Sequence, residues 1–225
     1  MMAAPGPAAS AALQPLREAT RELHHALDSR LRIGGEDATL ADYAEHLRAL
    51  RPWLGAVRSA LAASGVAALE AVSRQLALRL EALELDLRDL RDLRDAPAAR
   101  PATPPALPDS AALAAQATDP GFAWGLAYVV EGSRLGGSVM HRRLAPRLAP
   151  HPMRYFAPVG AEDGTPAHWR HFVAQLGEAL RDTAAMQSAQ RGAVAGFEAL
   201  MPCFGLAREG GTAPSPSRAA SLHAG

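Results

Sequence analysis

The sequence predicts an all-α fold in which several helices form one domain. Leucine and alanine dominate the 225 residues, whereas β-branched residues, which favour strands, are scarce and isoleucine occurs once. Apolar residues recur at helical spacing along most of the chain. A chain of this length can bury a sizeable core. We expect the helical domain to span residues 10–205, between a flexible start at 1–9 and a disordered tail at 206–225.

Charge and cysteine content limit the partners and the compartment. The 23 basic residues, all arginine, balance 23 acidic residues, so nothing favours a nucleic-acid partner. Cys203 is the single cysteine and cannot form an intramolecular disulfide, which fits a reducing cytoplasm. No signal peptide is recognised, and no apolar run reaches the roughly 18 residues of a membrane span. We therefore expect a cytoplasmic protein that does not enter a membrane.

Two amphipathic helices are expected before Gly65. The first should run over residues 10–32 and end before a glycine pair. Its apolar stripe consists of Leu13, Leu16, Leu23, Leu27 and Leu31. Thr20 falls on the same stripe. Thr39 is expected to cap the second helix, which Pro52 should kink or restart.

The middle of the chain predicts a long helix, a connector and a short helix. The long helix should follow Gly65 and reach about Asp95. Its end, LELDLRDLRDLRD, is interpreted as a solvated charged face, because a strict period of three drifts around a helix. The Pro-rich residues 96–108 form a connector that is too short to separate two domains. A short helix is expected from Ser110.

A glycine-containing helix is the most informative segment. It should begin at the N-cap Asp119 and end near Pro146. It contains Gly132, Gly136 and Gly137, although each glycine costs a helix interior roughly 1 kcal/mol relative to alanine. Gly132 and Gly136 share one face because they are four residues apart. Two interpretations are open here: close packing against another helix, or a flat ligand lying on the backbone.

Two more helices are expected after an irregular segment at 146–164. One should cover residues 165 to about 185 and the other residues 188 to about 203. If the glycine helix holds a ligand, we expect the first helix of the chain to hold it from the opposite side.

The segment YVVEGSRLGG resembles the distal helix of the bacterial biliverdin-producing heme oxygenases. In that family the helix kinks at its glycines over a heme plane. The resemblance implies a catalytic face made of Gly132, Ser133, Gly136 and Gly137. Animal members carry an aspartate at the position of Ser133, where it organises the water that serves oxygen chemistry. In this chain the group that delivers protons is therefore not identified from the sequence.

The family holds the heme iron through a histidine on its first helix, where this chain has His24 and His25. Adjacent helical residues point about 100° apart, so at most one of them can face the pocket. The segment LREATRELHHALDSRL is similar to the bacterial pattern L-R-x-x-T-x-x-x-H-x-x-L-(D/E), which matches His24 and not His25. The resemblance therefore implies that His24 is the iron ligand.

Other residues of this helix are carried over from the same motif. Asp28 lies four residues after His24, where its carboxylate could accept a hydrogen bond from the imidazole nitrogen that does not bind iron. Arg17 shares this face, and the resemblance implies that it meets a heme propionate. Thr20 is matched by the motif as well. An exposed acid and a solvated arginine remain the alternative interpretations of Asp28 and Arg17.

A third match lies near the C-terminal end of the chain. The segment HWRHF is similar to a family segment whose tryptophan, here Trp169, lies near the propionate edge of heme. Tyr128, four residues before Gly132, would point to the same edge. For Tyr128 and Trp169, packing in the core is an equally good interpretation.

Three other functions compete with this interpretation. A carboxylate-bridged di-iron site needs Glu-x-x-His on two helices, and the chain offers one such pair, Glu22 and His25. A heme carrier or sensor would use the same pocket without turnover, but His141 should lie too far along the helix to be a second strong ligand. A structural bundle without a ligand would leave the helix glycines unexplained.

The resemblance extends from Leu13 to Phe204 and implies a heme oxygenase. Such an enzyme cleaves heme b, which is both substrate and cofactor, to biliverdin, ferrous iron and carbon monoxide with O2. A ferredoxin or a flavoprotein reductase is implied as the electron donor, and a bacteriophytochrome as one acceptor of biliverdin. A non-catalytic heme carrier or sensor is the alternative.

Overall fold

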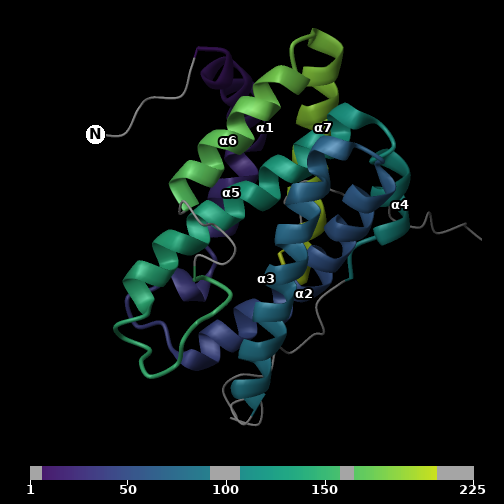
Figure 1. Cartoon of the computed structure of the whole chain (residues 1–225). Helices are drawn as coiled ribbons and strands as arrows, with labels where there is room; N and C mark the ends of the chain where they lie inside the picture. The colour runs from purple at the N-terminus through teal and green to yellow at the C-terminus, as the bar shows by residue number, and fades with distance from the viewer. Residues whose placement is uncertain (1–6, 92–106, 158–164, 207–225) are drawn as a thin grey trace, which may run out of the picture.

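The computed structural model describes residues 7–91, 107–157 and 165–206, and within them the chain is helical without strands, as predicted (Figure 1). The helices are α1 (Pro7–Asp28), α2 (Leu40–Ala63), α3 (Glu70–Asp89), α4 (Ser110–Gln116), α5 (Pro120–Leu144), α6 (Thr165–Ala179) and α7 (Thr183–Leu200). None of these helices is both long and apolar enough to cross a membrane. The expected flexible start, connector and tail lie mostly outside the described residues, although α1 begins at Pro7.

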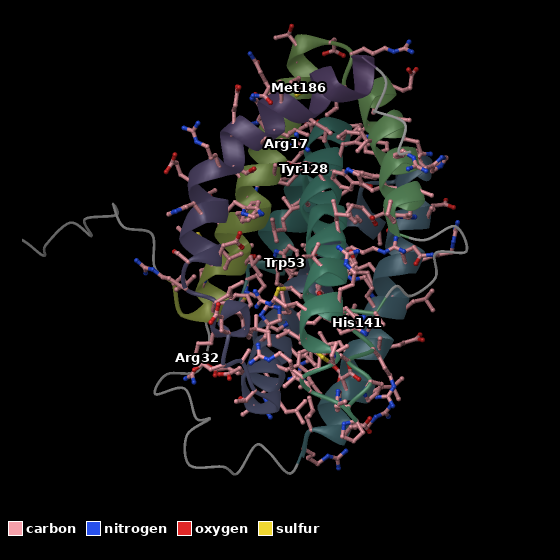
Figure 2. The ribbon with its side chains drawn as sticks, turned by 90° about the vertical axis from the view of Figure 1, so that its left-hand side faces the viewer. Arg17, Arg32, Trp53, Tyr128, His141 and Met186 are labelled. Carbon is pink, nitrogen blue, oxygen red and sulfur yellow. The ribbon has the colours of Figure 1, made fainter. Side chains whose placement is uncertain are left out.

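The long helix α5 runs through the middle of the bundle. It packs most extensively against α7, and α6 and α2 contact its other sides. In Figure 1, α5 crosses between the side formed by α1 and α6 and the side formed by α2 and α3. Trp53 of α2 lies deep in the core, where its Nε1 donates a hydrogen bond to the Gly196 carbonyl oxygen of α7 at 2.9 Å (Figure 2).

The helix starts follow the capping residues of the sequence. Thr39 and Asp42 form the reciprocal hydrogen bonds of a capping box at α2, and Asp119 accepts hydrogen bonds from the first backbone N–H groups of α5. Asp182 caps α7, which explains why α7 begins earlier than predicted. Of the two effects predicted for Pro52, a kink or a restart, the restart does not occur: α2 is one helix, because residues buried on both sides of Pro52 hold it against its neighbours.

Two glycines allow α5 and α7 to touch backbone to backbone. A Cβ atom added at Gly125 would lie 2.0 Å from the Ala189 carbonyl oxygen, and one added at Gly192 would lie 2.1 Å from the Phe122 carbonyl oxygen. No side chain fits at either position without moving a helix. The packing of small residues that helix glycines often serve is therefore found at Gly125 and Gly192.

The predicted solvated face of the LRD repeat is wrong at Asp86. This residue is fully buried, and its carboxylate accepts hydrogen bonds from the Tyr43 hydroxyl at 2.7 Å and the Tyr155 N–H at 2.9 Å. Arg154 also pairs with it at 2.9 Å. A period of three rotates successive aspartates around the helix, so one of them turns inward, where its partners offset the loss of water. The helix itself ends at Asp89 rather than Asp95.

Candidate functional site

His24 and Asp28 lie on one face of α1. The Nδ1 atom of His24 is 2.9 Å from Oδ2 of Asp28. In a neutral imidazole this contact keeps the proton on Nδ1 and leaves the Nε2 lone pair available to a metal. The ring of Phe197, on α7, lies 5.8 Å from the imidazole ring and restricts it further. The contact with Asp28 would therefore give a neutral His24 the tautomer that an iron ligand needs.

An open pocket of about 670 Å³ covers this face of α1. Its lining consists of Arg17, Thr20, Arg21, His24, His25, Asp28 and Ser29 of α1 and Tyr128 of α5. This volume lies within the range of about 300–1,000 Å³ that is usual for small-molecule sites. His25 also lines the pocket, so lining alone does not distinguish the two histidines. The pairing with Asp28 does distinguish them, because it involves His24.

One end of the pocket is polar. Figure 2 shows Arg17 and Tyr128 close together, and both residues line the pocket. Burial raises the pKa of Tyr128, while the charge of Arg17 and hydrogen bonds with Thr20 and Arg17 oppose this rise. Trp169 of α6 packs against Tyr128, with ring centroids 6.4 Å apart. The combination of a guanidinium and two hydroxyl groups suits a carboxylate.

Gly132 and Gly136 face open space. A Cβ atom added at either position would meet no atom within 4 Å, apart from the local helix backbone. A Cβ at Gly137 would lie 3.3 Å from the Phe156 ring. Helix packing therefore does not explain Gly132 and Gly136, in contrast to Gly125. Of the two interpretations left open by the sequence, the geometry favours room for a ligand.

An apolar cavity of about 240 Å³ lies beside Gly136 and Gly137. Its lining includes Leu27, Asp28 and Leu31 near the end of α1, and Ser133, Gly136, Gly137 and Met140 of α5. Asp28 also lines the open pocket, so the polar and apolar spaces adjoin at this residue. Arg17 belongs to the lining of the open pocket, and Gly136 and Gly137 belong to the lining of the apolar cavity.

A buried arginine of α3 reaches the backbone of α5 next to the glycines. Arg79 is 4% exposed and donates hydrogen bonds to the Val130 carbonyl oxygen at 3.2 Å and to Ser133 Oγ at 3.4 Å. It also donates to the Tyr155 hydroxyl oxygen at 2.8 Å. The sequence analysis missed Arg79 and Tyr155, because no sequence spacing relates α3 to the irregular segment before residue 157.

His46 of α2 is a second polar residue that the sequence analysis missed. It lines the apolar cavity, and its buried Nδ1 atom has no hydrogen-bond partner among the described residues. Burial lowers the pKa of His46 to about 4, so the imidazole is neutral near pH 7. Its ring lies between those of Phe156 and Phe204, at 5.5 and 5.3 Å.

A cluster of Asp86, Asp89 and His151 has donor atoms close enough to hold a metal ion, but its hydrogen bonds do not suit one. His151 Nδ1 accepts a hydrogen bond from the Met153 N–H at 3.1 Å, so the neutral ring carries its proton on Nε2, the atom nearer Asp86. Arg154 already bridges the two carboxylates. We interpret this cluster as the attachment of the segment after α5 to α3.

Comparison with known proteins identifies the family. The family model described as "Heme oxygenase" matches residues 10–205. A curated heme oxygenase from Xanthomonas campestris pv. campestris (strain 8004) is 40% identical over 100 residues, which cover 43% of this chain and 58% of that relative. No solved structure matches the chain. Since the family model spans most of the sequence, the chain belongs to the heme oxygenase family.

Proposed function

We propose that the protein cleaves heme b oxidatively to biliverdin, ferrous iron and carbon monoxide, using O2 and an external electron donor. One observation carries the proposal: the pocket that the carboxylate-paired His24 of α1 lines and the cavity that Gly136 of α5 lines adjoin at Asp28. Membership of the heme oxygenase family supplies the identity of the ligand.

The residues present fit a heme in this site. His24 would bind the iron through Nε2, and Asp28 would hold the imidazole in the required tautomer and orientation. Arg17, Thr20 and Tyr128 would receive the propionates at the polar end. Heme, when bound, supplies the redox chemistry, and the protein supplies binding and orientation.

The glycine end of the site would control access to the other face of the ring. Gly132 and Gly136 leave room for the macrocycle and for a small ligand against the α5 backbone, since no neighbouring side chain fills that space. Phe156 and Met140 add apolar walls that keep bulk water away from this side. The electron donor is proposed to be a ferredoxin or a flavoprotein reductase, and a bacteriophytochrome is one acceptor proposed for the biliverdin.

The test uses hemin and the whole chain. Hemin titration should give a saturable Soret band, and addition of a reductant in air should abolish this band while a biliverdin band grows and carbon monoxide is released. The same mixture without oxygen should keep its Soret band. A Soret band that persists through repeated reduction in air would instead indicate a heme carrier or sensor and would contradict the proposed activity.

A further inference from the structure

We propose that Tyr155, positioned by Arg79, is the hydrogen-bond donor to ligands that bind the heme iron on the glycine side of the site. This inference rests on the proposed heme-binding function. It assigns a role that the sequence analysis left without a residue, since the position at which animal relatives carry an aspartate is Ser133 in this chain.

Ser133 is in the right place but its hydrogen is already used. Its hydroxyl donates to the Val130 carbonyl oxygen at 2.7 Å, within the same helix. Its other polar contacts are with Arg79, at 3.4 Å, and an arginine can only donate. Ser133 therefore accepts from Arg79 and donates to its own helix, which leaves no hydrogen for a ligand.

Tyr155 has the opposite arrangement. Its hydroxyl oxygen accepts a hydrogen bond from Arg79 Nη2 at 2.8 Å, so its own hydrogen is not used in that contact. No residue in the described part of the chain accepts this hydrogen, although Tyr155 is only 4% exposed. Tyr155 lines the apolar cavity together with Gly136 and Gly137. A ligand in that cavity can therefore satisfy a buried donor that the protein leaves unsatisfied.

Arg79 makes this phenol a stronger donor. The guanidinium carbon lies 4.9 Å from the centre of the Tyr155 ring, and the hydrogen-bond acceptors of the guanidinium are neutral oxygens of Val130, Ser133 and Tyr155. Among the described residues, no carboxylate lies at hydrogen-bonding distance from this buried cation. Burial of such a cation is costly, and an electron-rich ligand nearby would offset part of that cost. Burial raises the pKa of Tyr155 although Arg79 opposes the rise, so the hydroxyl keeps its hydrogen at neutral pH.

The experiment measures ligand binding to the hemin complex rather than turnover. Fluoride affinity of the ferric complex and the C–O stretching frequency of the ferrous carbon monoxide complex both respond to a hydrogen bond on the glycine side. Tyr155→Phe should weaken fluoride binding about tenfold, the usual effect of one such hydrogen bond, and should shift the C–O stretch. Arg79→Gln, which keeps the phenol but removes the charge, should weaken fluoride binding by a smaller factor.

One matched variant serves as a control. Tyr43→Phe removes another buried tyrosine hydroxyl, but that group donates to Asp86 at 2.7 Å and does not line the cavity. It should bind fluoride within about twofold of the unmodified protein, because this hydroxyl supplies no hydrogen to the ligand. Ser133→Ala removes the hydroxyl that donates to Val130 and tests whether Ser133 is the donor instead.

The outcomes separate this inference from the proposed function. If the unmodified protein degrades heme but Tyr155→Phe and Arg79→Gln both keep its fluoride affinity and C–O stretch, this inference alone is overturned. The same holds if the loss appears in Ser133→Ala, or in His46→Leu, which tests another polar residue of the cavity. If the unmodified protein binds no hemin, both proposals fail. If Tyr155→Phe does not retain heme, the inference is tested with Arg79→Gln instead. An unchanged fluoride affinity in Arg79→Gln then overturns the inference.

Discussion

The Oδ2 atom of Asp28 lies 2.9 Å from Nδ1 of His24, one turn further along α1. The contact limits rotation of the imidazole, and an ordered side chain loses less conformational entropy when it binds a ligand. We propose that the pairing serves iron binding by the first helix.

Removal of this carboxylate should weaken the iron bond. We expect Asp28→Ala to lower hemin affinity by roughly 10–100-fold and to lower the iron–histidine stretching frequency of the ferrous complex, because the imidazole loses its acceptor. Glu22→Ala is the control, since Glu22 is an exposed acid of the same helix that pairs with Arg21. Equal losses in both variants would indicate a general effect of charge on α1.

The glycines of α5 should divide into two classes. Gly125→Ala should lower the free energy of unfolding of the apoprotein by about 2 kcal/mol or more, because its Cβ would lie 2.0 Å from a backbone oxygen of α7. Gly136→Ala should leave it unchanged or raise it by up to about 1 kcal/mol, because the added Cβ meets open space and alanine is the better helix former.

A bulkier residue tests the ligand role of the same face. Gly136→Leu should keep the helical circular dichroism and thermal stability of the apoprotein while hemin affinity or ligand binding to the iron falls. Thermal melts beside hemin titrations separate the two classes. A Gly136→Leu protein that melts as early as Gly125→Ala would show that Gly136 serves packing after all.

Asp86 should contribute far more to stability than its neighbour Asp89. We expect Asp86→Ala to lower the free energy of unfolding by roughly 3–5 kcal/mol, because it leaves buried donors such as the Tyr43 hydroxyl without an acceptor. Asp89→Ala should have a much smaller effect, since its side chain is 47% exposed although it pairs with the same Arg154. Urea unfolding measures both, and similar losses would contradict the assigned burial.

His46 predicts a specific dependence of stability on pH. Its pKa is lowered to about 4 in the folded protein, so between about pH 6.5 and 4 the unfolded chain binds a proton that the folded chain rejects. This contribution is fully present above about pH 6.5 and is lost as the pH falls to about 4, with a total on the order of 3 kcal/mol. His46→Gln should remove it. Identical pH slopes in the two apoproteins would be inconsistent with a neutral buried His46.

The sequence predicts the fold well where local chemistry decides it. Capping residues such as Thr39 and Asp119 place the starts of α2 and α5 correctly, because each satisfies backbone N–H groups within a few residues. The same local reasoning wrongly predicts that Asp86 of the LRD repeat is solvated, since the partners of that carboxylate come from α2 and from the segment after α5. A charge pattern on one helix does not reveal what packs against it.

The site, like the fold, could be predicted from the sequence where the information lies within one helix. His24, Asp28 and the glycine face were proposed from motifs that each lie within one helix, and Asp28 and Gly136 line the same cavity. The sequence alone could not show that Gly125 serves helix packing and Gly136 does not. The difference is that α7 lies against Gly125, whereas Gly136 faces open space. Arg79 and Tyr155 could not be recognised from the sequence, because their contacts join segments that are far apart in the chain. Arg79 of α3 donates hydrogen bonds to Ser133 of α5 and to Tyr155, which follows α5.

The resonance Raman and absorption spectra of the hemin complexes of His24→Ala and His25→Ala test the proposed heme site most directly. Both histidines lie on α1 and line the same pocket, so a general defect of the helix or the pocket would affect both variants alike. We predict that His24→Ala loses the iron–imidazole signature and most turnover. Added imidazole should partly restore the signature and the turnover of this variant. His25→Ala should keep a normal spectrum and a near-normal rate. Loss of the signature in His25→Ala with an active His24→Ala would show that the ligand is misassigned by one residue, and unchanged spectra in both variants would contradict heme ligation by α1.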